Sequence, residues 1–381
     1  MLRLDYKFTK ITYALFVFSW FLGDYTGNVH DDYKYAFWIL SFFFALCPII
    51  YYAMGYKKEK IVWDSYLLKQ ISFVVIAFAI ICVCAMPFNG YHLLMWKDLY
   101  YMIMPALYTF VIINMDRSEN LDYYMDLALL AYTAYFILGF GIQSFTLSNL
   151  MSINFSDSYS PWESGMADVF CISFFYFFMR KKYGRALVAG ILNFLSFKRL
   201  HLFFMAFCII FGRFLKDKPV PKAVEYVVKA FFIISPMLIT AMCSDTFANW
   251  FEATFDQSLN SFTTGRFNQI NLILDQDRNL TGLGMTHVVL VEQNFAVHRL
   301  HCDVLRFMIE TTFVGLAIFV NGYFNVAKKN QKAFSLMLFF FIVMFSSTCI
   351  ENTFYWFLIF ISIEGVMRAG NGALPLTSEE G

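Results

Sequence analysis

Charge is scarce in this sequence. Asp, Glu, Lys and Arg make up 15% of its 381 residues, whereas a typical soluble domain carries about 25%. Hydrophobic residues make up 59% and aromatic residues 20%. These proportions exclude an ordinary soluble enzyme, and they exclude a disordered protein, because disordered chains are poor in aromatic residues. With only eight cysteines in 381 residues, the chain is also not a disulfide-stapled secreted module, which is short and dense in cysteine.

Several chemical signatures are also missing. The sequence has neither the glycine-rich P-loop nor the dinucleotide-binding fingerprint, so we expect no nucleotide cofactor. The nearest approach to an Asp-x-Asp metal motif is Asp275-Gln276-Asp277, which we interpret as helix surface. The apolar residues come in continuous runs, and the absence of a period-two alternation argues against a transmembrane β-barrel.

Apolar runs of membrane-spanning length recur along the chain. Charged residues, Gly, Pro and Asn separate about twelve of them. They lie near residues 11–23, 35–54, 70–87, 98–115, 123–147, 165–179, 184–197, 200–215, 226–243, 304–323, 333–349 and 353–367. We therefore expect an all-α polytopic membrane protein with about 12 transmembrane helices. Residues 1–368 would form a single domain, and residues 369–381 a flexible tail.

Basic residues are unevenly divided between the two faces that these runs define. Most of the 29 Lys and Arg residues fall on the side of the N-terminus, which the positive-inside rule places in the cytoplasm. The exceptions on the outer side are Lys34, Lys97, Lys198, Arg199, Arg266, Arg278, Arg299 and Arg306. Most of these lie in a tight turn at 198–199 or in a long loop at 244–303, between the ninth and tenth runs. Because loops this long are usually functional, we expect the functional site on the outer face.

The outer loop contains a predicted helix over residues 265–277. Its apolar stripe consists of Phe267, Ile270, Ile273 and Leu274. Arg266, Gln269 and Asp277 face elsewhere on the same helical period, and residues 263–265 supply plausible capping groups. A Gly-x-Gly turn follows at Gly282 and Gly284, for which a plain turn is the simplest interpretation.

Histidines and charged residues lie where the loop enters the tenth run. His298 and His301 are three residues apart and would share a helix face. Together with His287 and Cys302 they could form a zinc site, but no carboxylate or thiol cluster completes a convincing set, so we expect no metal. Three ionisable residues follow at helical spacing, namely Asp303, Arg306 and Glu310. These three could simply neutralise one another at the membrane boundary.

The order of these features resembles the O-antigen polymerase and ligase superfamily (Wzy and WaaL). Its members carry a large periplasmic loop between late membrane spans. The polymerase signature Arg-x15-Gly is met here by Arg266 and Gly282. The motif Ser-Phe-Lys-Arg at 196–199 matches an arginine that the family places at a periplasmic helix turn upstream of the loop. The resemblance covers the whole predicted topology.

A ligase-type signature is met less well. Laid on this chain it starts at His301 and ends at Gly315, with Cys302 in place of Asn and Thr312 in place of the first Gly. These departures argue against a typical ligase. The resemblance therefore points to the O-antigen polymerase (Wzy) family within the superfamily.

Membership of this family would imply a GT-C-like glycosyltransferase bundle in the bacterial inner membrane. The implied reaction polymerises oligosaccharide repeat units. The growing glycan moves from undecaprenyl pyrophosphate to a sugar hydroxyl of a new lipid-linked unit at the periplasmic face, without a cofactor or metal. The implied partners are the lipid-linked oligosaccharide, membrane lipid and a chain-length regulator of the Wzz type, with no nucleic acid.

This chemistry suggests roles for the outer residues. A leaving pyrophosphate needs preorganised cations, and Arg holds phosphate better than Lys through two parallel hydrogen bonds, so Arg266 and Arg199 are catalytic candidates. His301 is the candidate general base, because a neutral imidazole can accept the acceptor's proton. His298 is the runner-up and Asp168 a further alternative. The candidate substrate-binding residues are Lys198, Arg299, His298, Gly282, Gly284 and Arg306.

Alternatives remain open at this stage. Lys198 and Arg199 could snorkel to anionic headgroups instead of forming a floor for the pyrophosphate. The chain could be an O-antigen ligase, which transfers glycan to lipid A core. It could also be a transporter or flippase, because twelve spans with both termini inside are typical of that class. Against transport, ionisable residues are almost absent from the middle of the runs.

Overall fold

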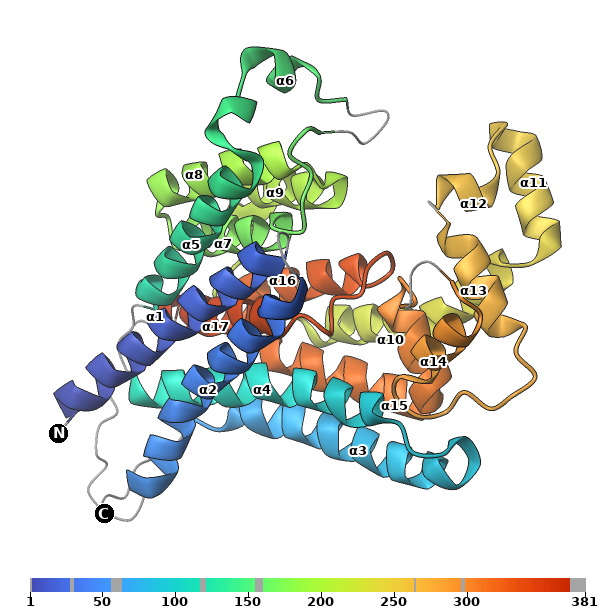
Figure 1. Cartoon of the computed structure of the whole chain (residues 1–381), viewed down its shortest axis with the longest axis horizontal. Helices are drawn as coiled ribbons and strands as arrows, with labels where there is room; N and C mark the ends of the chain where they lie inside the picture. Colours follow the sequence, from blue (N-terminus) through green and yellow to red (C-terminus); the bar gives the residue numbers. More distant parts are fainter. Residues whose placement is uncertain are drawn as a thin grey trace.

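The computed structural model describes residues 2–27, 31–55, 64–116, 121–154, 160–263, 265–295 and 299–370. The regular elements within these ranges are all helices (Figure 1). They are α1 (Leu2–Gly27), α2 (Asp31–Gly55), α3 (Tyr66–Asn89), α4 (Leu93–Met115), α5 (Asp122–Phe140), η1 (Ile142–Ser144), α6 (Leu147–Met151), α7 (Ala167–Met179), α8 (Tyr183–Ser196), α9 (Arg199–Phe211), η2 (Gly212–Phe214), α10 (Lys222–Met242), α11 (Asp245–Phe255), α12 (Leu259–Phe262), α13 (Arg266–Leu274), α14 (Met285–Glu292), α15 (Asp303–Ala327), α16 (Gln331–Val343) and α17 (Thr353–Gly370).

Each of the twelve predicted apolar runs coincides with a helix, from α1 to α5, α7 to α10 and α15 to α17. Among the described residues, α3, α4, α5 and α10 are long and apolar enough to cross a membrane, and shorter apolar helices cover Tyr35–Tyr51, α7 and α16. The chain is therefore an all-helical membrane protein. The number of crossings stays a prediction.

The short hairpin of α8 and α9 carries the predicted turn at 198–199. The two helices have 14 and 13 residues, or about 21 and 20 Å at 1.5 Å per residue. Both are shorter than the roughly 30 Å hydrocarbon core. The turn is therefore positioned by a short hairpin that packs on α7.

The centre of the bundle is occupied by α17, which packs against α4, α5, α7 and α16 (Figure 1). Its aromatic side chains account for much of this packing. Phe357 stacks on Tyr108 of α4 with ring centroids 5.0 Å apart, and Trp356 packs edge-to-face on Tyr323 of α15 at 4.8 Å. The α15 helix in turn packs against α3, α10 and α16. These contacts fix the outer ends of α4, α15 and α17 relative to one another.

A buried ionic cluster lies at the predicted cytoplasmic end of the bundle. The carboxylate of Asp122, at the start of α5, forms ion pairs with Arg180 at 3.4 Å, with Arg185 at 3.1 Å and with Lys182. Tyr176 donates a further hydrogen bond of 2.9 Å to Asp122. Arg185 also pairs with Asp126 at 3.2 Å, so three bases meet two acids here, which agrees with the excess of basic residues on this face.

The long outer loop folds into α11, α12, α13 and α14. The predicted helix at 265–277 is confirmed as α13, although it ends earlier, at Leu274. In Figure 1, α11 and α12 project away from the bundle, whereas α14 lies against α15. The functional candidates of the loop are therefore carried by the half that packs on the bundle. At the other end of the chain, α17 extends to Gly370, and the rest of the predicted tail lies outside the described residues.

Candidate functional site

Arg266 is the first residue of α13. The preceding Gly265 has a φ of +84°, a left-handed conformation that glycine adopts without strain. In the turn before it, the hydroxyl of Thr263 accepts a hydrogen bond of 3.1 Å from the Phe267 amide, so the predicted capping role of this segment is found at Thr263. The carbonyl of Thr263 accepts a bond of 3.1 Å from Arg266 Nη1. The half-buried guanidinium is thus held at the start of the helix.

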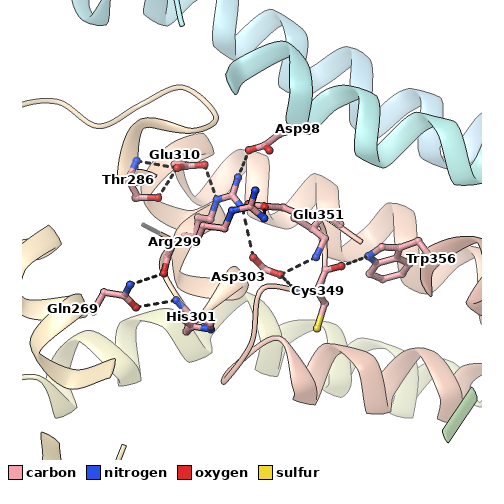
Figure 2. A network of polar contacts seen from close by, with 12 residues as sticks. Asp98, Gln269, Thr286, Arg299, His301, Asp303, Glu310, Cys349, Glu351 and Trp356 are labelled. Atoms are coloured by element: carbon pink, nitrogen blue, oxygen red, sulfur yellow. Dashed lines mark hydrogen bonds and ion pairs between the residues drawn. The ribbon is translucent and has the colours of Figure 1, made fainter. Parts of the chain in front are cut away.

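Gln269 joins α13 to the segment that contains His301. The helical period places Gln269 off the apolar stripe, yet its side chain is buried at 2% exposure. Figure 2 shows its amide contacting both neighbours: the nitrogen donates to the Arg299 carbonyl, and the oxygen accepts a 3.0 Å bond from the His301 amide. A buried amide needs such partners. Satisfying them places His301 beside α13.

Gln269 joins Arg299 and His301, and the charges of Arg266 and Arg299 act on His301. Burial, followed by the positive charges of Arg266 and Arg299, holds the pKa of His301 below its ordinary value of 6.5. Burial likewise lowers the pKa of both arginines, which nonetheless stay charged at neutral pH. The structure therefore brings together three of the predicted site residues, with a neutral histidine next to two cations. We call these three residues the histidine–arginine site.

Arg306 forms a second, closed cluster on α15. Its guanidinium is buried at 3% exposure and is surrounded by four carboxylates. Its partners are Glu310 at 3.1 Å, Glu351 at 2.9 Å, Asp303 at 3.7 Å and Asp98 in a close ion pair. The mutual neutralisation of Asp303, Arg306 and Glu310 suggested by their spacing is thus present. Arg306 as a direct substrate ligand stays a prediction, although its donors already face carboxylates.

The two sites share an edge at the turn between α16 and α17. Glu351 pairs with both Arg306 and Arg299. Asp303 accepts the amide of Ile350 at 3.0 Å, and Trp356 donates to the Cys349 carbonyl at 3.1 Å (Figure 2). The turn at 349–351 is therefore tied to α15 through Asp303 and Arg306 and to α17 through Trp356.

Sequence reasoning missed two members of the Arg306 cluster, Asp98 and Glu351. Each lies at the outer edge of an apolar run, where an ionisable residue is a signal in itself. Their pairing with Arg306 could not be predicted from local spacing, however, because Asp98 and Arg306 are 208 positions apart.

The Gly-x-Gly turn docks the loop onto the bundle. Gly282 and Gly284 have φ values of +115° and +83°. A Cβ on Gly284 would lie 2.6 Å from the Cβ of Leu94 on α4, so a larger residue cannot fit. The Gly282 amide donates 2.7 Å to the Glu310 carbonyl, and Thr286 donates its amide and hydroxyl to the Glu310 carboxylate at 3.0 and 2.7 Å. The two glycines therefore have a structural reason for their identity, and their predicted substrate contacts stay predictions.

A backbone break follows directly in α15. Thr312 has φ +64° and ψ 175° inside the helix. A β-branched residue at positive φ is a genuine outlier. This is also the position at which the ligase-type signature has its first Gly.

Lys198 and Arg199 have different surroundings. Lys198 donates to Asp168 of α7 at 2.9 Å, and the other oxygen of Asp168 lies 2.8 Å from Nε2 of the buried His201. Asp168, an alternative base, is thus engaged by two partners, and His201 was missed by sequence reasoning. Arg199 is exposed at the start of α9. The turn contacts α7 and is separate from the histidine–arginine site.

The remaining candidates can be placed briefly. His298 lies outside the described residues. Cys243 and Cys302 both have free thiols. Within the described part of the chain, no group of three or more His, Cys, Asp and Glu residues is arranged to hold a metal ion. Comparison of the chain with protein families, with curated proteins and with solved structures finds no match.

Proposed function

We propose that this protein is a polymerase of undecaprenyl-pyrophosphate-linked oligosaccharide repeat units at the outer face of the bacterial inner membrane. The observation that carries the proposal is the grouping of Arg266, Arg299 and His301 where the long outer loop meets α15. Two permanent cations suit a pyrophosphate leaving group, and a neutral histidine suits proton removal from a hydroxyl. A GT-C-like bundle and a Wzz-type partner belong to the same proposal.

In the proposed mechanism, the donor pyrophosphate binds the guanidinium groups of Arg266 and Arg299. Arg299 is 38% exposed and has five N–H donors, so it can contact the pyrophosphate as well as Glu351. The acceptor hydroxyl oxygen forms a bond to the donor's anomeric carbon while the bond from that carbon to the pyrophosphate oxygen breaks. The electron pair leaves with the pyrophosphate, and the hydroxyl proton passes to His301.

The decisive experiment is an analysis of the lipid-linked glycans in a deletion strain. Single repeat units on lipid A core are expected and indicate a polymerase. Long chains that accumulate on undecaprenyl pyrophosphate would indicate a ligase, and repeat units confined to the cytoplasmic leaflet would indicate a flippase. Either of these outcomes would overturn the proposal.

Arg266 provides a test of the site itself. If its guanidinium binds the pyrophosphate through two hydrogen bonds, Arg266→Lys should impair polymer formation nearly as much as Arg266→Ala. Arg278→Lys is the matched control, because Arg278 lies in the same loop and pairs with the exposed Glu292. The readout is the polysaccharide ladder at equal protein levels. A normal ladder from Arg266→Lys would show that Arg266 contributes charge alone.

An O-antigen ligase is the second candidate, and one observation favours it. Thr312 adopts the positive φ that a glycine in the ligase-type signature would adopt freely. The spacing from His301 to Thr312 therefore fits the ligase-type signature, even though the signature has a glycine where this chain has Thr312. The deletion strain separates the two functions.

A further inference from the structure

A cavity of about 400 Å³ opens between the ends of α1, α5 and α17 and the segment that precedes α7. Its lining is Asp24, Tyr132, Tyr135, Gly139, Phe140, Glu163, Ser164, Gly165, Met166 and Tyr355. The cavity therefore lies at the predicted outer ends of these elements. The cavity shares no residue with the histidine–arginine site or with the Arg306 cluster. Its volume is that of a small-molecule site.

Asp24 supplies a carboxylate that neutral groups hold in place. One oxygen accepts 2.9 Å from the Tyr132 hydroxyl and the other accepts 3.2 Å from the Trp38 indole. Tyr135 donates 3.2 Å to the backbone carbonyl of the same residue. None of the ion pairs found among the described residues includes Asp24. Trp20 is a third side-chain hydrogen-bond donor to this carboxylate. Since a carboxylate has about four acceptor sites, Asp24 can accept a further hydrogen bond from a ligand.

The opposite wall offers complementary groups. Glu163 is exposed at the rim, and Tyr355 is oriented by a 2.8 Å hydrogen bond to the Gly165 carbonyl. The Ser164 hydroxyl is buried and has no hydrogen-bond partner within the described chain. Buried polar atoms are normally paired, so this hydroxyl indicates a ligand with hydrogen-bonding groups.

The chemistry of the lining selects the ligand. Two carboxylates repel a phosphate but accept hydrogen bonds from the hydroxyls of a sugar. The partly exposed ring of Tyr355 in the lining offers aromatic surface for the C–H face of a pyranose. We propose that this cavity binds a sugar residue of the acceptor glycan, with Asp24 and Glu163 as its hydrogen-bond acceptors. This inference rests on the proposed polymerase function.

The position of the cavity fits an acceptor subsite. The Ser164 amide donates 3.3 Å to the Ser196 carbonyl, and the Asp168 amide donates 3.3 Å to the Gly165 carbonyl. The cavity wall is therefore bonded to the elements that carry Lys198 and Arg199. A polymerase holds two lipid pyrophosphates, and this chain has two cationic places on its outer side. A lipid-linked unit at the 198–199 turn would have its first sugars beside the cavity, leaving the histidine–arginine site for the donor.

The test is sugar binding by the purified full-length protein in detergent. The probes are the methyl glycosides of glucose, galactose, mannose, rhamnose, N-acetylglucosamine and N-acetylgalactosamine, followed by saturation-transfer NMR. At least one should bind saturably, and Asp24→Asn and Glu163→Gln should each weaken it at least tenfold. Asp275→Asn, an exposed site in the outer loop, is the matched control and should bind normally. Because Glu163 is exposed, its substitution tests the cavity without threatening the fold.

Several outcomes would overturn the inference. Binding of none of the six glycosides would do so, as would binding that both acidic-site variants leave unchanged. Inorganic pyrophosphate that competes with the glycoside would identify a phosphate site instead. The binding assay requires no polymerisation, so its result can be told apart from the result of the deletion strain. A ligase pattern in the deletion strain together with Asp24-dependent sugar binding would refute the polymerase and retain the sugar site.

Discussion

Two buried ionic clusters, at opposite predicted faces of the membrane, have opposite compositions. On the predicted cytoplasmic side, Asp122 lies among three bases, of which Arg185 also pairs with Asp126. On the outer side, Arg306 is the single base at the centre of four acids. The excess of bases in the first cluster agrees with the predicted orientation, in which basic residues are retained inside.

The two clusters also differ in how far they can relax. The side chains of Lys182 and Arg185 on the cytoplasmic side are 33% and 46% exposed, so they can reach water if their acid is lost. Each carboxylate around Arg306 is exposed by less than a tenth. The outer cluster therefore depends on its central residue. Through Glu351 it also supports Arg299, and thereby connects the stability of the bundle with the histidine–arginine site.

Loss of Arg306 should have the largest effect. Arg306→Leu leaves four buried carboxylates without their cation, and removal of one partner from a buried ion pair costs about 3–5 kcal/mol. We expect little folded protein, measured as the monodisperse fraction and the Tm in detergent. Asp122→Asn is the matched variant in the cytoplasmic cluster and should lower the Tm much less. Equal losses in the two variants would contradict the difference drawn between the clusters.

His301→Gln should have the second-largest effect, and this effect should be on the reaction rate and not on folding. A general base contributes about 10²–10⁴-fold to the rate, and glutamine cannot take the proton. We expect polymer formation to fall by this factor while Tm and donor binding stay unchanged. The control is His92→Gln, at the outer end of α4. An active His301→Gln enzyme would remove this residue from the mechanism and direct attention to His298 and Asp168.

Gln269 is expected to act as a positioning residue. Gln269→Ala removes both hydrogen bonds to the 299–301 segment, and small displacements of a catalytic group cost up to about a hundredfold. We expect a roughly 10- to 100-fold lower kcat with KM nearly unchanged. Gln269→Glu keeps the acceptor for the His301 amide and should be intermediate. Gln276→Ala, which removes a hydrogen bond within the same loop, is the control; an equal loss there would indicate a general effect on the loop.

The smallest effect concerns pH. Activity requires neutral His301, so it should fall only as the pH drops through the lowered pKa of this residue, below 6.5. Arg299→Gln removes one positive neighbour and should therefore raise this pKa and move the acid limb of kcat/KM toward neutral pH. Arg278→Gln should leave the limb in place. An acid limb above pH 6.5 in the wild type, or an acidward shift in Arg299→Gln, would contradict the assignment.

Sequence patterns predicted the helices better than they predicted the site. Apolar runs report helix positions directly, and all twelve coincide with helices. The helical period likewise located α13, but it gave no sign that Gln269 is buried, because periodicity assigns faces and does not identify partners. A buried amide is stable when the fold supplies partners, and here they come from 30 and 32 positions away.

The partners of charged residues were also hard to predict when they lie far apart in the sequence. Arg306 with Glu310 was visible as an i, i+4 pair, whereas the contact of Lys198 with Asp168 spans 30 positions. Glu351 connects to Arg306 only because α15 and α17 pack around the same turn. Local spacing reveals local pairs, and the rest of a site is set by which helices pack together.

The short helices have a consequence for the lipid around the protein. Helices α7, α8, α9 and α16 have 13 or 14 residues, about 20 Å at 1.5 Å per residue, whereas α3 has 24, or about 36 Å. On the hairpin of α8 and α9, exposed apolar side chains such as Leu187 and Phe203 would face the acyl chains of a surrounding bilayer across this shorter length. A bilayer accommodates such hydrophobic mismatch by becoming locally thinner. The headgroup of a lipid-linked substrate would thereby be lowered toward the 198–199 turn, so that bilayer thickness becomes part of substrate access.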